Sequence, residues 1–445
     1  MSWSANPKLP RSRQPMKTFI RSLLTLSVSL GASLASASPD WQTVSPASDP
    51  LLTNAAGQLI DEQGALLTDR AGEPLPPKCA LANLDPRPPV AQFKFFVQAG
   101  DPSKLVVFHT GGGACWNNLT CASSLGGARG TYSAVITETP ESLKYAGGIL
   151  DGDAPANPFA GWTKVYIPYC TGDVGWGNRD AFYSVPGFGP VPISHRGYAN
   201  VRAVTEWLQR RFHAEGTPSK ILVAGSSAGG YAAIGTLFPE VAAVAGSRTD
   251  FYVIGDSANG IVTDEFLQTA RGNWGIDATL PGYVLSAIDP GAAGLSTRVY
   301  ANSARTYRQV RFGQYQNAFD LNQAQIFNIM KNPDNPLLWT DESAITAALM
   351  EWTVAMRANT LATALNPGYR FYTAAGYEHT VLINIGPEAG LGFVSDDFYS
   401  ESSARALTGP VAFRDWANDM VNKKGILWRT GDWKNATCFP NCNVQ

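Results

Sequence analysis

The sequence predicts an α/β fold with a mostly parallel central sheet and helices on both of its faces. Short, nearly continuous apolar runs recur along the chain, separated by intervals long enough for a helix. Continuous apolar runs, in contrast to alternating ones, are typical of parallel strands that are buried on both faces. The expected strands are residues 93–97, 104–109, 164–168, 221–224, 251–254, 310–312 and 369–373.

Three intervals predict helices. Residues 198–212 carry apolar side chains at the spacing of one helical face, namely Val201, Val204, Leu208 and Phe212. A second helix, residues 231–237, follows the strand at 221–224. A third is expected to start with Thr340 as its N-cap, to carry Asp341 and Glu342 in its first turn and to continue to about Leu365.

The N-terminus is predicted to be a secretory signal peptide, residues 1–37. Lys17 and Arg21 precede an apolar run, and small residues end in an A-x-A-like site at Ala35-Ser36-Ala37. Met16 would be the true start if residues 1–15 are an upstream extension; the alternative is a disordered tail. The apolar run is too short and too rich in serine for a stable membrane span. We therefore expect a secreted or periplasmic protein.

The mature chain divides by composition into two regions. Residues 38–87 are polar, contain Gly and Pro, and predict an extended segment that wraps the domain. Residues 88–445 hold the main domain, in which 263–308 and 331–366 are predicted to form a lid or insert. We find no internal repeat in the sequence.

Composition limits the partners and cofactors. The chain has 445 residues, 16% charged, with a formal net charge of −2 and no Lys/Arg-rich tract, which argues against nucleic acid as a partner. Four scattered histidines and the lack of a C-x-x-C motif give no support for a metal site. No cofactor is expected, and the oligomeric state is left open.

Six cysteines in an exported chain predict disulfides. Cys115 lies close to Cys121 along the chain, and Cys438 lies close to Cys442, which would leave Cys79 for Cys170. Spacing alone does not fix the connectivity.

Residues 221–230, ILVAGSSAGG, contain the pattern G-x-S-x-G directly after a predicted strand. In α/β-hydrolases this pattern forms a sharp strand-to-helix turn that lifts the serine hydroxyl above the sheet edge. Ser227 is therefore the candidate nucleophile. The alternative is a tight turn that needs small residues.

A glycine-rich loop, HTGGGACW, follows the strand at 104–109. Such loops supply backbone N–H groups to the oxyanion of an acyl-transfer intermediate. We expect Gly112 and Gly113, together with the N–H of Ala228, to form this oxyanion hole.

The base and the acid of a triad follow the serine in chain order in this fold. His379 is the histidine that comes after Ser227, on a loop beyond the strand at 369–373. Asp320 and Asp256 both follow strands between the serine and the histidine. Asp320 is favoured because its strand immediately precedes the histidine's strand, and Asp256 remains the rival.

The motifs GGGACWNNLTC, KVYIPYCTGDVGWG, GSSAGGYAA, GDSANG, FDLNQ and YEHT, in this order, resemble those of the pectin acetylesterases and the related Notum carboxylesterases. The resemblance covers about residues 77–380 and implies an α/β-hydrolase-like serine esterase with Ser227, His379 and Asp320 as its triad. It also implies the disulfides Cys115–Cys121 and Cys79–Cys170. Two positions depart from the family, because Thr110 stands where a Glu is common and the tryptophan expected near Gly113 comes later, as Trp116.

The predicted function is a secreted carboxylic-ester hydrolase that deacetylates an acetylated polysaccharide. The alternatives are a lipase-like or polyester-type esterase and, in a different class, a non-catalytic secreted binding protein. Trp176 and Asp256 follow predicted strands, where ligands bind in such folds. Together with Trp116, they are the expected substrate contacts.

Overall fold

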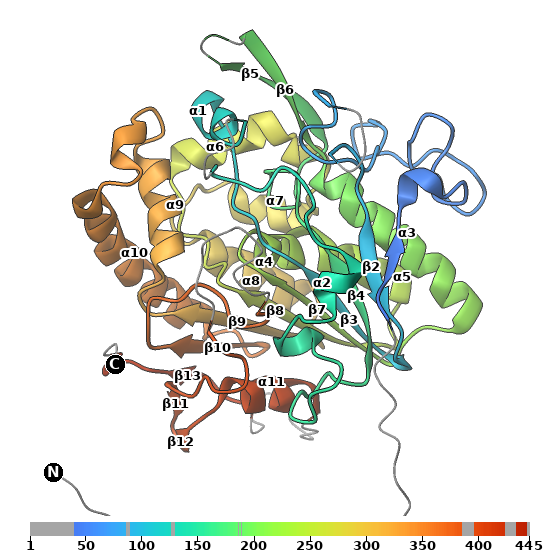
Figure 1. Cartoon of the computed structure of the whole chain (residues 1–445). Coiled ribbons are helices and arrows are strands. Elements are labelled where there is room, and N and C mark those ends of the chain that lie inside the picture. Colours follow the sequence, from blue (N-terminus) through green and yellow to red (C-terminus); the bar gives the residue numbers. More distant parts are fainter. Residues whose placement is uncertain are drawn as a thin grey trace, which may run out of the picture. The chain divides into compact units, whose positions relative to one another are not determined.

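An eleven-stranded sheet runs through the described part of the chain in the order β1-β2-β4-β3-β7-β8-β9-β10-β13-β11-β12, and a separate hairpin is formed by β5 and β6 (Figure 1). The computed structural model describes residues 40–85, 90–125, 130–185, 187, 189–384, 396–422 and 433–442. The predicted signal peptide lies outside the described residues.

The strands have the following bounds: β1 Gln42–Val44, β2 Phe95–Gln98, β3 Asp101–His109, β4 Trp162–Ile167, β5 Arg179–Val185, β6 Gly189–His195, β7 Lys220–Ser226, β8 Asp250–Asp256, β9 Arg311–Asn317, β10 Tyr369–Ala374, β11 Arg405–Ala406, β12 Gly409–Pro410 and β13 Ala436–Thr437.

The helices have the following bounds: α1 Asn118–Ser123, α2 Pro140–Leu143, α3 Gly197–Glu215, α4 Ala228–Ala232, α5 Phe238–Ala245, α6 Asp264–Trp274, α7 Gly282–Ile288, α8 Leu295–Thr306, α9 Leu321–Lys331, α10 Glu342–Thr363 and α11 Phe413–Asn422. Short helical turns are η1 Pro46–Ser48, η2 Gly148–Leu150, η4 Ile276–Ala278 and η5 Pro336–Leu338, and a π-helical turn, η3 Ala233–Leu237, joins α4 to α5.

The centre of the sheet is parallel, as the continuous apolar runs predict. Strands β4, β3, β7, β8, β9 and β10 pair in parallel in that order. The predicted α/β fold with a mostly parallel sheet is therefore confirmed, and each of the seven predicted strands corresponds to one of the observed strands. Strands β2 and β1 extend the sheet in the antiparallel sense.

Helices cover both faces of this sheet. Tyr300 of α8 contacts Phe312 with ring centroids 6.3 Å apart, whereas Phe413 of α11 contacts Tyr315 at 5.0 Å. Residues 312 and 315 of β9 differ in parity along the strand, so their side chains point to opposite faces. Helices α8 and α11 accordingly lie on opposite sides of the sheet (Figure 1).

Two helix boundaries differ from the prediction. Helix α10 has Asp341 as its N-cap in place of Thr340, because the Asp341 carboxylate accepts a hydrogen bond from the amide of Ala344 at 2.8 Å. The helix after Ser227 extends from Ala228 to Ala245, beyond the predicted 231–237. By length and composition it could cross a membrane, but 67% of it is buried inside this domain, as expected for a core helix.

The N-terminal segment contains a repeat that the sequence analysis missed. Asn54, Asp61 and Asp69 each begin a turn in which the side chain accepts from the amides two and four residues later. A glycine with positive φ follows three residues after each of them. In the sequence this repeat is visible as an Asn/Asp-x-x-Gly pattern whose first residues are seven and then eight positions apart. A search for hydrophobic periodicity does not detect such a pattern of polar residues and glycines.

The two predicted inserts are helical. Residues 263–308 form α6, α7 and α8, and residues 331–366 form η5 and α10. The three expected disulfides, Cys79–Cys170, Cys115–Cys121 and Cys438–Cys442, are all present.

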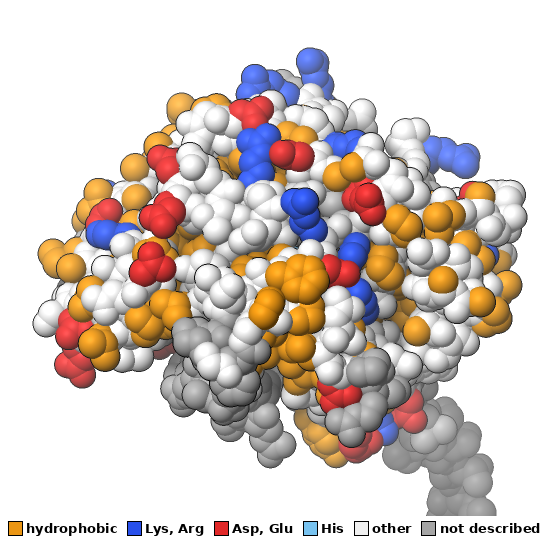
Figure 2. Space-filling view, turned by 90° about the horizontal axis from the view of Figure 1, so that it is seen from above, with side chains coloured by type: hydrophobic (Ala, Val, Ile, Leu, Met, Phe, Trp, Pro, Cys, Tyr) orange, Lys and Arg blue, Asp and Glu red, His pale blue; other side chains and the backbone are white. Residues whose placement is uncertain are grey.

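On the face shown in Figure 2, basic and acidic side chains are interspersed, with hydrophobic side chains exposed between them.

Candidate active site

The candidate residues come together because parallel strands end at the same edge of the sheet. Ser227 follows β7, Asp320 lies three residues after β9, and His379 lies five residues after β10. The glycine-rich loop follows β3, which pairs with β7 in parallel. Four segments that are far apart in the sequence therefore converge beside the carboxyl end of β7.

Ser227 occupies a strained turn between β7 and α4. Its φ of 54° and ψ of −125° are unusual for a residue with a side chain. A Cβ at Gly225 would lie 2.1 Å from the carbonyl oxygen of Gly229, and a Cβ at Gly229 would lie 2.0 Å from that of His109. Both flanking positions therefore require glycine, which explains the G-x-S-x-G pattern sterically.

His379 and Asp320 form a buried pair. The His379 Nδ1 atom lies 2.8 Å from Oδ2 and 3.0 Å from Oδ1 of Asp320. Both side chains are almost fully buried. Burial alone would lower the pKa of His379, but the neighbouring Asp320 carboxylate more than offsets this, so the pKa lies above its usual 6.5. Asp320 is thus placed to fix the imidazole tautomer and to stabilise the imidazolium.

Asp320 is itself held by α9. It is the N-cap of that helix, and its Oδ1 accepts from the Gln323 amide at 2.9 Å. The Gln323 side chain donates to Oδ2 of Asp320 at 2.8 Å and lies 2.7 Å from Gln316. Sequence analysis assigned no role to Gln323. The sequence feature that could have predicted this role is a glutamine three residues after an N-cap aspartate. At that position both the backbone amide and the side-chain amide of the glutamine can donate to the aspartate.

Asp256 occupies a different place from the one predicted for a substrate contact. Its carboxylate is fully buried and accepts from the Ser226 hydroxyl and from the amides of Val381 and Leu382. Asp256 does not line the cavity described below. His379 Nδ1 contacts the carboxylate of Asp320, so the geometry favours Asp320 over Asp256 as the orienting acid.

The predicted oxyanion donors lie beside the serine. Gly112, Gly113 and Ala228 line the same cavity as Ser227 and His379. Ala228 is the first residue of α4, so its N–H has no acceptor within the helix. These three backbone groups are therefore available to a negatively charged oxygen near Ser227.

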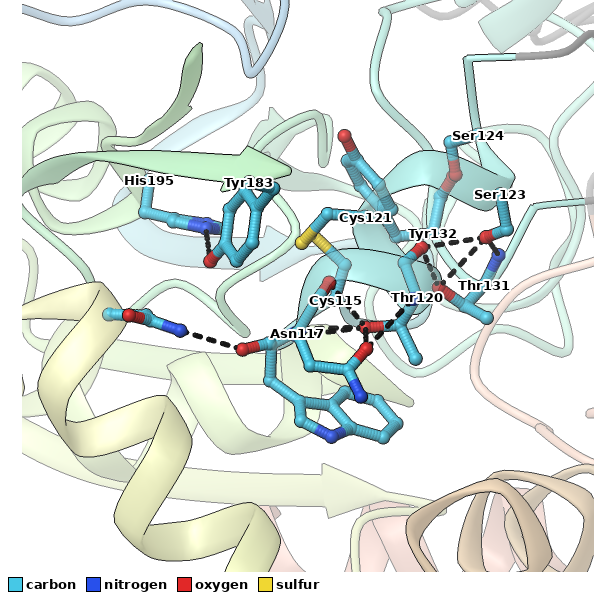
Figure 3. Close-up of a disulfide and its surroundings, with 12 residues drawn as sticks. Cys115, Asn117, Thr120, Cys121, Ser123, Ser124, Thr131, Tyr132, Tyr183 and His195 are labelled. Carbon is cyan, nitrogen blue, oxygen red and sulfur yellow. Dashed lines mark hydrogen bonds between the residues drawn. A yellow bond between two sulfur atoms is a disulfide. The ribbon is translucent and has the colours of Figure 1, made fainter. Parts of the chain in front are cut away.

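Residues 131–133 and the Cys115–Cys121 disulfide brace the glycine-rich loop; Figure 3 shows the disulfide with Thr131 and Tyr132. The Ser133 amide donates to the Gly112 carbonyl at 2.7 Å, and the Ala114 amide donates to the Thr131 carbonyl at 3.0 Å. The Cys115–Cys121 disulfide then ties the loop to α1. The loop is thus held from both sides, as preorganised donors require.

Replacing Gly113 with alanine is expected to lower kcat by roughly 10²–10³-fold, the usual loss for one oxyanion donor. Gly113 has a φ of 72°, and a Cβ there would lie 2.0 Å from the Thr131 carbonyl oxygen, so the loop must shift. Gly57→Ala is the matched control, because Gly57 has a φ of 71° with no atom within 4 Å of the added Cβ. Normal kcat in Gly113→Ala would contradict this role of the loop.

A cavity of about 590 Å³ opens at Ser227 and His379. Its walls are mainly apolar and come from α6, α9 and α10, with residues that include Phe266, Leu267, Trp274, Ile326, Met330 and Trp352. Asn322, Gln325 and Thr340 add polar groups. The two predicted inserts therefore supply much of the wall, which sequence patterns could not assign.

The two predicted tryptophans differ in position. Trp176 lines the cavity, and its indole N–H donates to the Tyr231 carbonyl at 2.9 Å. Trp116 lies behind the wall, with its ring centroid 4.9 Å from that of Phe266, and is not a lining residue. The predicted contact between Trp116 and the substrate finds no support in this lining, because the Trp116 ring packs against Phe266 of α6, which does line the cavity.

Comparisons with known proteins point to one group of hydrolases. Residues 84–257 match the family model described as Pectinacetylesterase. A 77-residue stretch is 38% identical to the palmitoleoyl-protein carboxylesterase NOTUM of Schmidtea mediterranea; it covers 17% of this chain but only 14% of that relative. The matched family segment includes the glycine-rich loop and Ser227, whereas Asp320 and His379 lie beyond it.

Two crystal forms of the Wnt deacylase Notum from Drosophila are similar to the structure. One shares 17% sequence identity with a TM-score of 0.49 and covers 72% of this chain and 86% of that chain. The other shares 18% identity with a TM-score of 0.48 and covers 72% and 85%, respectively.

Proposed function

We propose that this chain, whose residues 84–257 match the family model described as Pectinacetylesterase, is a serine carboxylic-ester hydrolase that uses Ser227, His379 and Asp320. The buried His379–Asp320 pair, whose histidine lines the same cavity as Ser227, is the observation that supports a catalytic function over a binding function. A binding protein would have no need for a strained serine and an oriented imidazole on the same cavity.

The proposed reaction has two halves. Ser227 Oγ attacks the ester carbonyl carbon while His379 Nε2 takes the hydroxyl proton, and the N–H groups of Gly112, Gly113 and Ala228 hold the oxyanion. His379 then returns the proton to the leaving alcohol, and an acyl-enzyme remains on Ser227. Water, deprotonated by His379, attacks the acyl-enzyme carbonyl, and His379 returns that proton to the leaving Ser227 Oγ, which releases the carboxylic acid and restores the enzyme.

The cavity supports a bulky apolar acyl group as the substrate class. Its volume of about 590 Å³ lies in the range that encloses whole drug-sized ligands, far beyond the need of an acetyl group. Each methylene buried in such a wall contributes about 0.8 kcal/mol of binding. The geometry therefore favours the lipase-like alternative over the acetylated polysaccharide.

The acetylated polysaccharide stays as the second candidate, because the matched family is described as Pectinacetylesterase. In that case only the acetyl group would reach Ser227, and the sugar polymer would occupy the rest of the cavity. The two candidates predict opposite responses to acyl length.

For the apolar acyl group, kcat/KM on p-nitrophenyl esters is expected to rise from acetate by about fourfold per methylene until the cavity is filled. Ala270 is buried on α6 and lines this cavity. Ala270→Phe should therefore abolish the gain for octanoate and longer esters while leaving acetate turnover near normal. A steep fall from acetate onward, with acetate release from acetylated pectin, would support the second candidate instead.

We also propose that the protein acts outside the cytoplasm. Three disulfides and an N-terminal segment with the features of a signal peptide support export. Detection of mature protein that begins near Ser38 in the secreted or periplasmic fraction would test this.

A further inference from the structure

Asp256 is a second buried carboxylate near the triad, and the proposed reaction does not use it. It ends β8, the strand between the serine strand and the Asp320 strand. Its exposed fraction is zero. A buried carboxylate is costly unless several donors compensate it, so its contacts indicate what it is for.

The Asp256 side chain forms hydrogen bonds both to the turn that carries Ser227 and to the loop that carries His379. Its Oδ2 atom accepts from the Ser226 hydroxyl at 2.7 Å, on the residue directly before the nucleophile. The same oxygen accepts from the amides of Val381 at 3.1 Å and Leu382 at 3.0 Å, two and three residues after His379. One oxygen atom thus links the serine turn to the histidine loop.

Two further bonds strengthen this link. The main-chain carbonyl of Asp256 accepts from the amide of Ser227 at 2.8 Å. Ser257, which has a φ of 54°, contacts Oδ1 of Asp256 at 3.1 Å and donates through its hydroxyl to the His379 carbonyl. The strained backbone at Ser257 persists because these partners hold it.

We propose that Asp256 is a positioning residue that sets the distance between Ser227 and His379. This inference rests on the proposed esterase function. Asp256 holds the histidine loop against the serine turn, whereas Asp320 orients the imidazole ring through Nδ1. Misplacement of reacting groups by about 1 Å can cost on the order of 10²-fold in rate, so such a clamp has a measurable effect on turnover.

The charge of Asp256 adds a second, separable effect. The ionisable groups that face His379 are Asp320 and Asp256, and both raise its pKa against the opposing effect of burial. Burial also raises the pKa of Asp256 itself, and Tyr315 of β9 is its other ionisable neighbour. Loss of the Asp256 charge removes a contribution that raises the His379 pKa. The acidic limb of the activity profile should then move to lower pH, because the base must be neutral.

The test compares Asp256→Ala, Asp256→Asn and Ser226→Ala in the mature full-length chain. Rates are expressed per site titrated with a fluorophosphonate, so that misfolded protein does not count. Asp256→Ala should lower kcat roughly 10²-fold with KM within about threefold. Asp256→Asn keeps an acceptor oxygen, so its kcat should be much closer to the wild-type value than that of Asp256→Ala. The acidic limb of its pH–activity profile should lie at lower pH than in the wild type. Ser226→Ala removes one donor and should cost about fivefold.

Two results would overturn the proposal. One is normal kcat per titrated site and an unmoved pH profile in Asp256→Ala and Asp256→Asn. The other is a loss in Asp256→Asn as large as in Asp320→Asn, which would make Asp256 the orienting acid. If Asp256→Ala does not fold, Asp256→Asn and Ser226→Ala decide the question. Failure of the esterase proposal itself would appear separately, as no turnover by the wild-type chain.

Discussion

Replacing Ser227 with alanine is expected to lower kcat for ester hydrolysis by roughly 10⁵–10⁶-fold, as removal of the nucleophile does in serine hydrolases. The residual rate would come from the oxyanion donors and binding alone. Alanine lacks the hydroxyl but fits the same turn, so the cavity should keep its shape. Steady-state kinetics on the preferred p-nitrophenyl ester measures the loss.

Ser226 provides the matched control for Ser227. It is adjacent in the sequence, but its hydroxyl bonds to the buried Asp256 instead of facing the cavity. Ser226→Ala should therefore cost only about fivefold, far less than Ser227→Ala. Comparable losses in the two variants would contradict the assignment of Ser227 as the nucleophile.

Replacing Asp320 with asparagine is expected to lower kcat by roughly 10⁴-fold, as in other triads in which the orienting carboxylate becomes an amide. Both Asp320 oxygens face Nδ1 of His379, so an asparagine offers either an amide N–H, which requires Nδ1 to be unprotonated, or a carbonyl without charge. The imidazole then loses its preferred tautomer and the stabilisation of its charged form.

The substitution should leave stability nearly unchanged, which separates catalysis from folding. Asparagine caps helices about as well as aspartate, so the bond to the Gln323 amide at the start of α9 can remain. Thermal unfolding of Asp320→Asn should therefore resemble that of the wild type. Near-normal turnover in this variant would show that another residue orients His379.

The order of strands allows the proposed catalytic residues to be predicted from the sequence. Ser227 and His379 were identifiable because a G-x-S-x-G turn and a late histidine each follow an apolar strand. Strand order left Asp320 and Asp256 as rivals, since both follow strands at the same sheet edge. The structure separates them by side-chain direction, because Asp256 points to the backbone of the histidine loop and Asp320 points to the ring.

The cavity wall was beyond sequence analysis for a physical reason. Residues 263–308 form three helices whose apolar side chains are divided between the core and the cavity, so no single face appears in the pattern. Trp116 was expected as a substrate contact, but its ring packs against Phe266 of α6, which itself lines the cavity. Tertiary packing decides which aromatic ring stands in front.

The most direct test of the proposed function is peptide mass mapping after treatment of the mature protein with a fluorophosphonate. An activated serine forms a covalent adduct, whereas an ordinary serine in a tight turn does not. We expect one adduct on Ser227, none on Ser226, and none when the protein is unfolded first. No adduct, or an adduct on another serine, would contradict a catalytic Ser227–His379–Asp320 site.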